Sequence, residues 1–88
     1  MITVSDEAAT LIRTLVEAAT LPDTAGLRLG TDDKMHSLDM HLEANPRPGD
    51  EVLEHDGVAL FVSPLASARL NEQTLDAQVE GRPAFFLT

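Results

Sequence analysis

The feature that most constrains the fold is an Asp-Gly dipeptide between two strand-like segments. Asp56-Gly57 separates residues 51–55 from the apolar run 58–62. Asp-Gly favours a two-residue type I′ turn, because glycine adopts a positive φ angle without steric cost. The sequence therefore predicts a tight β-hairpin. Because residues 58–62 are apolar on both faces, we expect this strand to lie inside a sheet, with a helix on at least one side.

An amphipathic helix is predicted close to the start of the chain. Residues 2–4 favour a short strand, and Ser5 is a good N-cap for a helix that follows. Apolar residues recur at three- and four-residue intervals from Ala8 to Ala19, which places them on one helix face. Pro22 marks the end of this helix, since proline disfavours helical geometry in the residue before it.

A second, shorter helix is predicted after the hairpin. Ser63 provides a cap and Pro64 suits the first helical position. We expect this helix to run from Pro64 to about Leu70 and to bury Leu65, Ala66 and Leu70.

The other segments have strand-like patterns. In residues 25–31, Leu27 and Leu29 alternate with Arg28, and residues 38–44 alternate strictly between apolar and polar side chains. Further strands are predicted at 75–79 and 84–87. Together these elements predict an α+β fold: mixed, largely antiparallel β-sheets with an N-terminal helix and a short second helix.

The composition of the chain excludes several classes of partner and of protein. Eighty-eight residues are enough for one domain, expected to span 1–88. The 15 acidic and 6 basic residues give a net charge of −9, which repels phosphate backbones and anionic lipid. We therefore expect neither nucleic acid nor a membrane as a partner. There is no leader-like or membrane-spanning segment and no cysteine for a disulfide scaffold, so we expect a cytoplasmic protein.

Several short motifs occur in an order that resembles the HesB-like domain of A-type iron–sulfur carrier proteins. These motifs are residues 2–9 (Ile-Thr-Val-Ser-Asp-Glu-Ala-Ala), residues 25–30 (Ala-Gly-Leu-Arg-Leu-Gly), Asp50-Glu51-Val52 and Asp56-Gly57-Val58. The resemblance implies a HesB-like fold over the whole chain. It also implies a protein partner, whose identity the sequence does not give, and a homodimer. The apolar face of 38–44 and the pair Phe85-Phe86 are the surfaces we expect to pair.

The residues that bind the cluster in this family are absent from the chain. The family works through three cysteines, and this chain has none. Matching the strands places the family's first cysteine at Met35 or His36. Its other two lie in a tail beyond the final strand, and we expect that tail to be absent here, since the sequence stops at Thr88. Iron–sulfur clusters are ordinarily held by thiolates. The sequence therefore predicts no cluster and no other cofactor.

Histidines and carboxylates remain as potential ligands for a harder or borderline metal ion. His36 with Asp32 or Asp33 is the one local group of such residues, and it is a weak candidate metal site. We interpret His41 as an exposed strand residue and His55 as a residue flanking the hairpin.

Nothing in the sequence indicates catalytic residues. Ser5 and Ser63 are better explained as helix caps than as nucleophiles, and we interpret Asp32-Asp33 and Asp50-Glu51 as solvated acids in turns. The leading hypothesis is a non-catalytic HesB-like module, an accessory or interaction protein linked to iron–sulfur cluster biogenesis. The alternative is a non-thiolate metal-binding protein that uses His36. A small enzyme is a third hypothesis, and it would need a deep pocket lined by a histidine and an acid.

Overall fold

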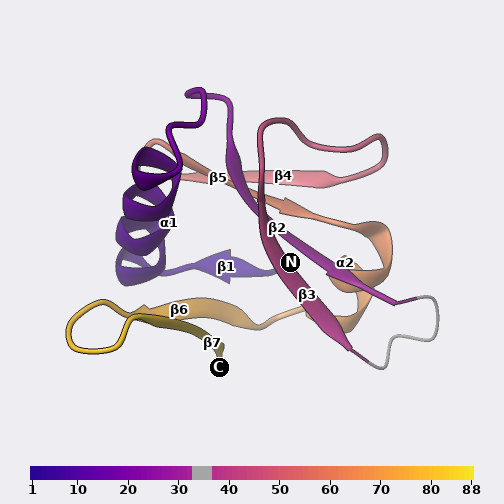
Figure 1. The fold of residues 1–88 in the computed structure, drawn as a ribbon. Helices are drawn as coiled ribbons and strands as arrows, with labels where there is room; N and C mark the ends of the chain where they lie inside the picture. Colours follow the sequence, from indigo (N-terminus) through magenta and orange to yellow (C-terminus); the bar gives the residue numbers. More distant parts are fainter. Residues whose placement is uncertain (33–36) are drawn as a thin grey trace.

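The computed structural model describes residues 1–32 and 37–88 of the chain. Over these residues it has an α+β fold with two helices and two mixed sheets, as predicted (Figure 1). The elements follow the order β1 (Thr3–Val4), α1 (Asp6–Ala18), β2 (Gly26–Thr31), β3 (Leu38–Glu43), β4 (Glu51–His55), β5 (Val58–Val62), α2 (Pro64–Arg69), β6 (Thr74–Gln78) and β7 (Ala84–Leu87).

The larger sheet has four strands in the order β3-β2-β5-β4. Its two outer pairs are antiparallel, and β2 and β5 run parallel in the middle. The smaller sheet has the order β1-β6-β7, with β1 parallel and β7 antiparallel to β6. Antiparallel pairs therefore outnumber parallel ones among the described strands, which confirms the predicted character of the sheets.

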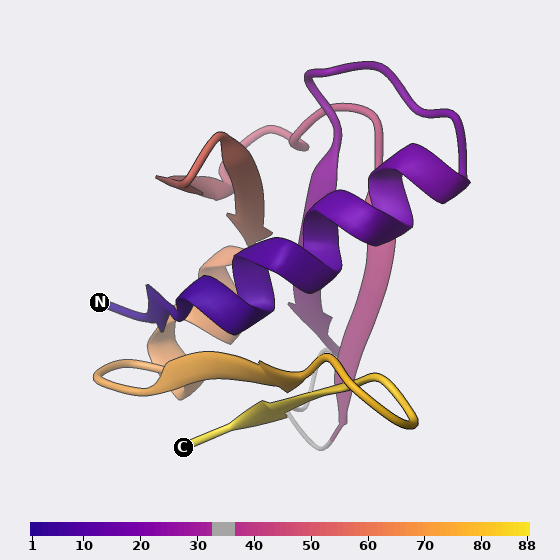
Figure 2. The ribbon, with the colours of Figure 1, turned by 90° about the vertical axis from the view of Figure 1, so that its left-hand side faces the viewer.

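The core lies where helix α1 meets both sheets. Helix α1 contacts β6 of the smaller sheet and β2 and β5 of the larger one, and Figure 2 shows it crossing in front of the larger sheet, beside the β6–β7 hairpin. Ile12 of α1, Leu29 of β2, Leu60 of β5 and Leu75 of β6 are almost completely buried. The N-terminal helix therefore joins the two sheets into one hydrophobic core.

The predicted hairpin is confirmed. Strands β4 and β5 pair in antiparallel register from Glu51 opposite Val62 to His55 opposite Val58. Asp56 and Gly57 have φ angles of 50° and 80°, the positive values that a type I′ turn requires. Strand β5 lies between β2 and β4, so its position inside the sheet is also confirmed.

Both predicted caps are present. The Ser5 Oγ accepts a hydrogen bond from the Ala8 N–H at 3.1 Å, and Ser63 caps α2 in the same way. The expectation that Leu65 is buried is wrong, because 41% of it is exposed. Helix α2 has only six residues, and it turns Ala66 rather than Leu65 to the core. Ala19 is also exposed, since it lies after the last helical residue.

Strand β2 is more buried than its alternating pattern predicts. Arg28, which alternates with Leu27 and Leu29 along the strand, is buried as they are. Strands β3 and β4 lie at opposite edges of the sheet, so the chain between them passes from one edge to the other. Asp50, at the end of this connection, contacts the Arg28 side chain. Neither helix in the described part of the chain is long and apolar enough to cross a membrane.

Candidate functional site

The predicted metal-ligand group lies largely outside the described residues. His36 and Asp33 fall there, as does Met35, the other position matched to the family's first cysteine. Asp32 is described, and its backbone N–H donates to the Ser37 carbonyl at 3.4 Å. The prediction that His36 lies with Asp32 or Asp33 therefore stays a prediction.

His41 is an exposed strand residue, as predicted. Its Nε2 lies 3.0 Å from a carboxylate oxygen of Glu43, two residues along β3. The same carboxylate oxygen accepts a hydrogen bond from Arg47 at 2.6 Å. These contacts with Arg47 and His41 hold the pKa of Glu43 below its ordinary value. The Glu43 carboxylate is thus already neutralised by a guanidinium.

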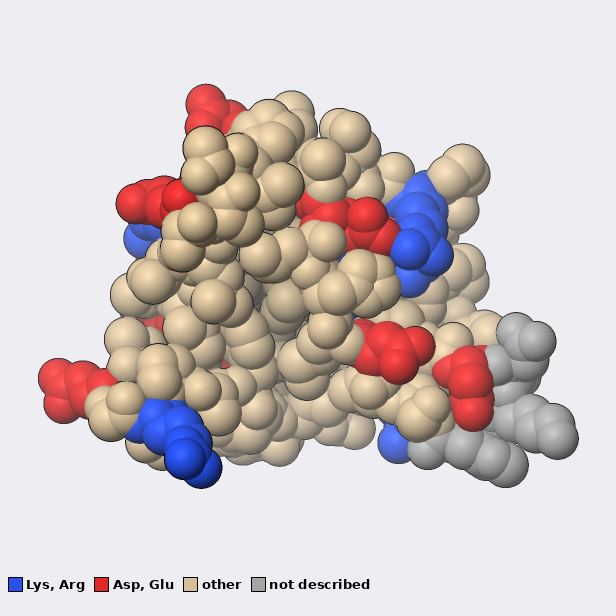
Figure 3. All heavy atoms as spheres, in the orientation of Figure 1, with Lys and Arg blue, Asp and Glu red and all other residues tan. Residues whose placement is uncertain are grey.

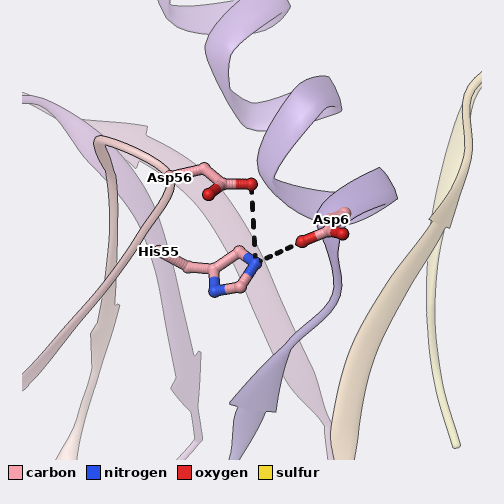
Figure 4. A group of neighbouring side chains, drawn as sticks. All are labelled: Asp6, His55 and Asp56. Atoms are coloured by element: carbon pink, nitrogen blue, oxygen red, sulfur yellow. Dashed lines mark hydrogen bonds and ion pairs between the residues drawn. The ribbon is translucent and has the colours of Figure 1, made fainter.

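His55 lies in a group that was not predicted from the sequence. It flanks the hairpin beside Asp56, as expected, but its Nε2 is also 2.6 Å from Asp6 Oδ1, at the start of α1 (Figure 4). Asp56 Oδ2 lies 3.7 Å from the same nitrogen. One donor atom from each of the three residues thus lies within 4.8 Å of the others. Asp6 and His55 are 49 positions apart, so no local motif could reveal the contact.

Both sides of this group are fixed by local structure. Ser5 precedes Asp6, and besides capping α1 its hydroxyl donates to Asp76 Oδ1 on β6 at 2.7 Å. On the other side, the hairpin turn fixes the positions of His55 and Asp56. Arg13, two turns along α1 from Asp6, donates a side-chain hydrogen bond to the Asp56 backbone carbonyl. Helix α1 therefore contacts the hairpin tip at two points.

The hydrogen bond that His55 Nε2 donates to the Asp6 carboxylate is also the main electrostatic influence on His55. It raises the pKa of the imidazole above its ordinary value of 6.5, with a smaller contribution from the charge of Asp56. Both carboxylates favour a positive charge at this point, since an opposite charge nearby stabilises the protonated ring. The group therefore consists of two carboxylates placed around one imidazole.

A second group of charged residues is structural. Arg28 donates two hydrogen bonds to the two carboxylate oxygens of Asp50, each 2.9 Å long. Asp50 also accepts the backbone N–H of Arg47 at 2.9 Å, and only 1% of its side chain is exposed. The interpretation of Asp50 as a solvated acid is wrong. Arg28 lowers the pKa of the Asp50 carboxyl, because its hydrogen bonds stabilise the ionised form.

The charged residues do not form one continuous patch on the face seen in Figure 3. Acidic and basic side chains there lie in separate small groups among neutral atoms. Among the residues coloured in that view, this face carries no basic patch of the kind that binds a phosphate backbone. His55 and Glu54 line an open surface pocket together with residues 1–4 and Leu53.

Comparison with solved structures assigns the family. The chain is similar to SufA of Escherichia coli, described as involved in the biosynthesis of iron–sulfur clusters, at 31% identity. The match covers 99% of this chain and 83% of the SufA chain, with a TM-score of 0.80. The chain belongs to the HesB-like family of A-type iron–sulfur carriers. The predicted resemblance is therefore confirmed.

Two other structures share the fold of this HesB-like chain at lower identity. IscA, solved with a [2Fe-2S] cluster, is 18% identical, with 100% of this chain and 84% of IscA covered and a TM-score of 0.71. A protein from Aquifex aeolicus, solved in solution by NMR, is 22% identical, with 99% and 89% covered and a TM-score of 0.76. No family model matches the chain, and no curated protein matches it.

The donor set of this HesB-like chain does not suit an iron–sulfur cluster. Its 88 residues contain no cysteine, so no thiolate is available to bind cluster iron. The two histidines within the described residues, His41 and His55, contact carboxylates. Even a cluster with mixed histidine ligation keeps two cysteine ligands.

Proposed function

We propose that this HesB-like chain is a non-catalytic accessory or interaction protein in iron–sulfur cluster biogenesis. The observation that carries the proposal is the combination of family membership with a ligand set free of cysteine. The structural match to a carrier covers 99% of this chain, whereas its 88 residues contain no thiolate that would hold a cluster. What such a chain keeps is a surface that proteins of the assembly pathway can bind.

The buried part of the structure supports this proposal. The described residues include a core of buried side chains between the two sheets and a buried Arg28–Asp50 ion pair, and neither of these involves a metal cluster. A chain that folds without its family's cargo can work through its surface alone. The partner we propose is another protein of cluster assembly, and the cytoplasmic location expected from the sequence is part of the same proposal.

Reconstitution tests the loss of cluster binding. The purified chain is incubated anaerobically with ferrous iron, sulfide and a reducing thiol, then desalted, with SufA treated in parallel. We expect no visible absorption band and no stoichiometric iron or acid-labile sulfide on this chain. A bound cluster that survives desalting would contradict the proposal.

Affinity purification tests the interaction role. The tagged chain is isolated from its own cells, and co-purifying proteins are quantified. The control is a tagged Gly26→Ala variant, which we expect to be destabilised because its Cβ atom would lie 2.4 Å from the Ala59 carbonyl oxygen. We expect proteins of iron–sulfur cluster assembly to be enriched on the folded chain. An enriched set without any of them would reject the accessory role.

The alternative proposal, metal binding by His36 with Asp32 or Asp33, rests on the sequence alone. Zinc titration of wild type and His36→Ala tests it directly. Zinc binding that disappears in this variant would support it, and equal binding would reject it.

A further inference from the structure

The point where the start of α1 meets the tip of the β4–β5 hairpin brings three metal-ligand side chains together. Asp6, His55 and Asp56 direct one donor atom each toward the same small volume (Figure 4). These atoms are an imidazole nitrogen and two carboxylate oxygens. Borderline divalent ions such as zinc accept this combination.

The three side chains start from backbone positions that are already fixed. Asp56 occupies the first turn position, where its φ of 50° is set by the type I′ geometry. The hydrogen bond from Arg13 to the Asp56 carbonyl holds this turn against the helix that carries Asp6. Binding a cation here would therefore require little further ordering of the backbone.

A proton on His55 Nε2 can form a hydrogen bond with only one of the two carboxylates. His55 Nε2 carries one hydrogen at most, and it is 2.6 Å from Asp6 but 3.7 Å from Asp56. The second carboxylate is thus beyond hydrogen-bonding distance of the ring. A metal ion at the same point would accept a lone pair from all three residues and would balance both negative charges.

We propose that Asp6, His55 and Asp56 bind one divalent transition-metal cation. Metal–ligand distances of about 2.0–2.2 Å require neighbouring donor atoms to lie about 3.0–3.6 Å apart. Small rotations of the two carboxylates bring them there, and these side chains have room to rotate, since 78% of Asp6 and 59% of Asp56 are exposed. Three protein ligands leave a fourth position for water.

The charge of the molecule favours the same ligand. A net charge of −9 raises the local concentration of cations around the chain. This site is distinct from the predicted His36 group, and it does not depend on the accessory function proposed above. Reconstitution and affinity purification test the accessory function, whereas zinc titration of the site variants tests this site, so either proposal can fail without the other.

Zinc chloride titrated into the purified full chain by calorimetry tests the site. The variants are His55→Gln, Asp6→Asn and Asp56→Asn; asparagine tolerates the positive φ of the turn, so the last change preserves the hairpin. His41→Gln is the matched control. His41 also contacts a carboxylate, but Arg47 already occupies that carboxylate and repels a second cation.

We expect one zinc ion per chain in wild type and His41→Gln. Removing a residue that only hydrogen-bonds to a metal ligand typically weakens metal binding about 10–100-fold. Removing a ligand itself should cost at least as much, so we expect each of the three ligand variants to bind zinc at least about tenfold more weakly than wild type. Imidazole ¹⁵N spectra give a second readout, in which zinc should shift the His55 Nε2 signal and leave that of His41 in place. Thermal melts in a chelator check that each variant is folded.

Three results would overturn the proposal. The first is the absence of zinc binding by wild type. The second is binding that His55→Gln or either aspartate variant leaves unchanged. The third is binding that His41→Gln abolishes, or a spectrum in which zinc shifts a histidine other than His55.

Discussion

Asp50 is the residue whose environment differs most from what its neighbours suggest. It lies in a Pro/Gly/Asp segment, yet only 1% of its side chain is exposed and Arg28 holds both of its oxygens. Breaking a buried ion pair is costly, because the remaining charge is left without a partner in a poorly solvated place.

We therefore predict that Asp50→Asn lowers the free energy of unfolding by about 3 kcal/mol. The buried Arg28 guanidinium would lose its countercharge, because the asparagine amide is neutral and offers a single acceptor oxygen. Urea unfolding followed by circular dichroism measures the change. Asp39→Asn, a change at an exposed position of β3, is the control and should cost less than about 0.5 kcal/mol. Equal losses in the two variants would show that the ion pair has no special role.

The same pair predicts how stability depends on acid. Arg28 lowers the pKa of Asp50 in the folded state from its ordinary value of 3.8. A group with a lowered folded-state pKa stabilises the protein at pH values above the unfolded-state pKa, and this contribution is lost as the pH falls through the folded-state pKa. We expect the urea midpoint of wild type to drop more steeply below about pH 4 than that of Asp50→Asn. Parallel acid curves would contradict this assignment.

Both groups of charged residues show why single-residue environments were hard to predict. The partner of Asp50 is 22 residues away, and that of His55 is 49 residues away. Neither contact follows from a spacing rule, because each depends on how the strands are ordered. His41, whose described contacts are local, was predicted correctly as an exposed strand residue.

At the scale of elements, short-range signals predicted most of the fold. The Asp-Gly hairpin, the two serine caps and the N-terminal helix each depend on residues within a few positions of one another. The strand order β3-β2-β5-β4 was not predicted, since periodicity identifies a strand but not its neighbour. The expectation that Leu65 is buried was wrong, because the apolar spacing in a helix of only six residues does not define one face.

The parallel pairing of β2 with β5 leads to a prediction about two glycines. A Cβ atom at Gly26 would lie 2.4 Å from the Ala59 carbonyl oxygen, whereas one at Gly57 would meet nothing within 4 Å. We expect Gly26→Ala to force the two central strands apart and to destabilise the protein by about 3 kcal/mol or more. Gly57→Ala should cost only about 1 kcal/mol, the strain of a positive φ in alanine.

Thermal or urea unfolding of the two alanine variants separates a steric clash from backbone strain. If Gly57→Ala proves to be the more damaging change, the close approach of β2 and β5 is not the constraint we infer.

At the scale of the whole molecule, exposed apolar side chains make self-association the main expectation. Met40 on edge strand β3, Val52 on edge strand β4 and Phe86 on β7 are 38%, 46% and 44% exposed. Such edges favour pairing with another chain, whereas a net charge of −9 opposes it. The predicted homodimer should therefore form more readily as salt screens this repulsion.

Light scattering across a range of salt concentrations measures this association. We expect the mass to rise above 9.5 kDa as salt increases, and Met40→Glu to reduce the rise. A mass that stays at the monomer value at high protein and salt concentrations would rule out the dimer.

The smaller sheet also brings the two ends of the described chain together. Thr3 pairs with Thr74 on one side of β6, and Thr88 exchanges two backbone hydrogen bonds with Thr74 on the other side. Figure 2 places both ends on the same side of the molecule. Strands are about 4.8 Å apart, so these residues are separated by about 10 Å, a gap that a linker of about five glycine and serine residues can span.

This proximity makes the chain a candidate for circular permutation. We predict that joining residue 88 to residue 1 and opening the exposed turn between Gly81 and Arg82 preserves a cooperative melt. The permuted chain should refold more slowly, because β6 and β7 would pair across almost the whole sequence instead of across a short turn. Circular dichroism and stopped-flow refolding measure the two effects; a permutant that folds as fast as the parent would mean that this hairpin forms late on the folding pathway.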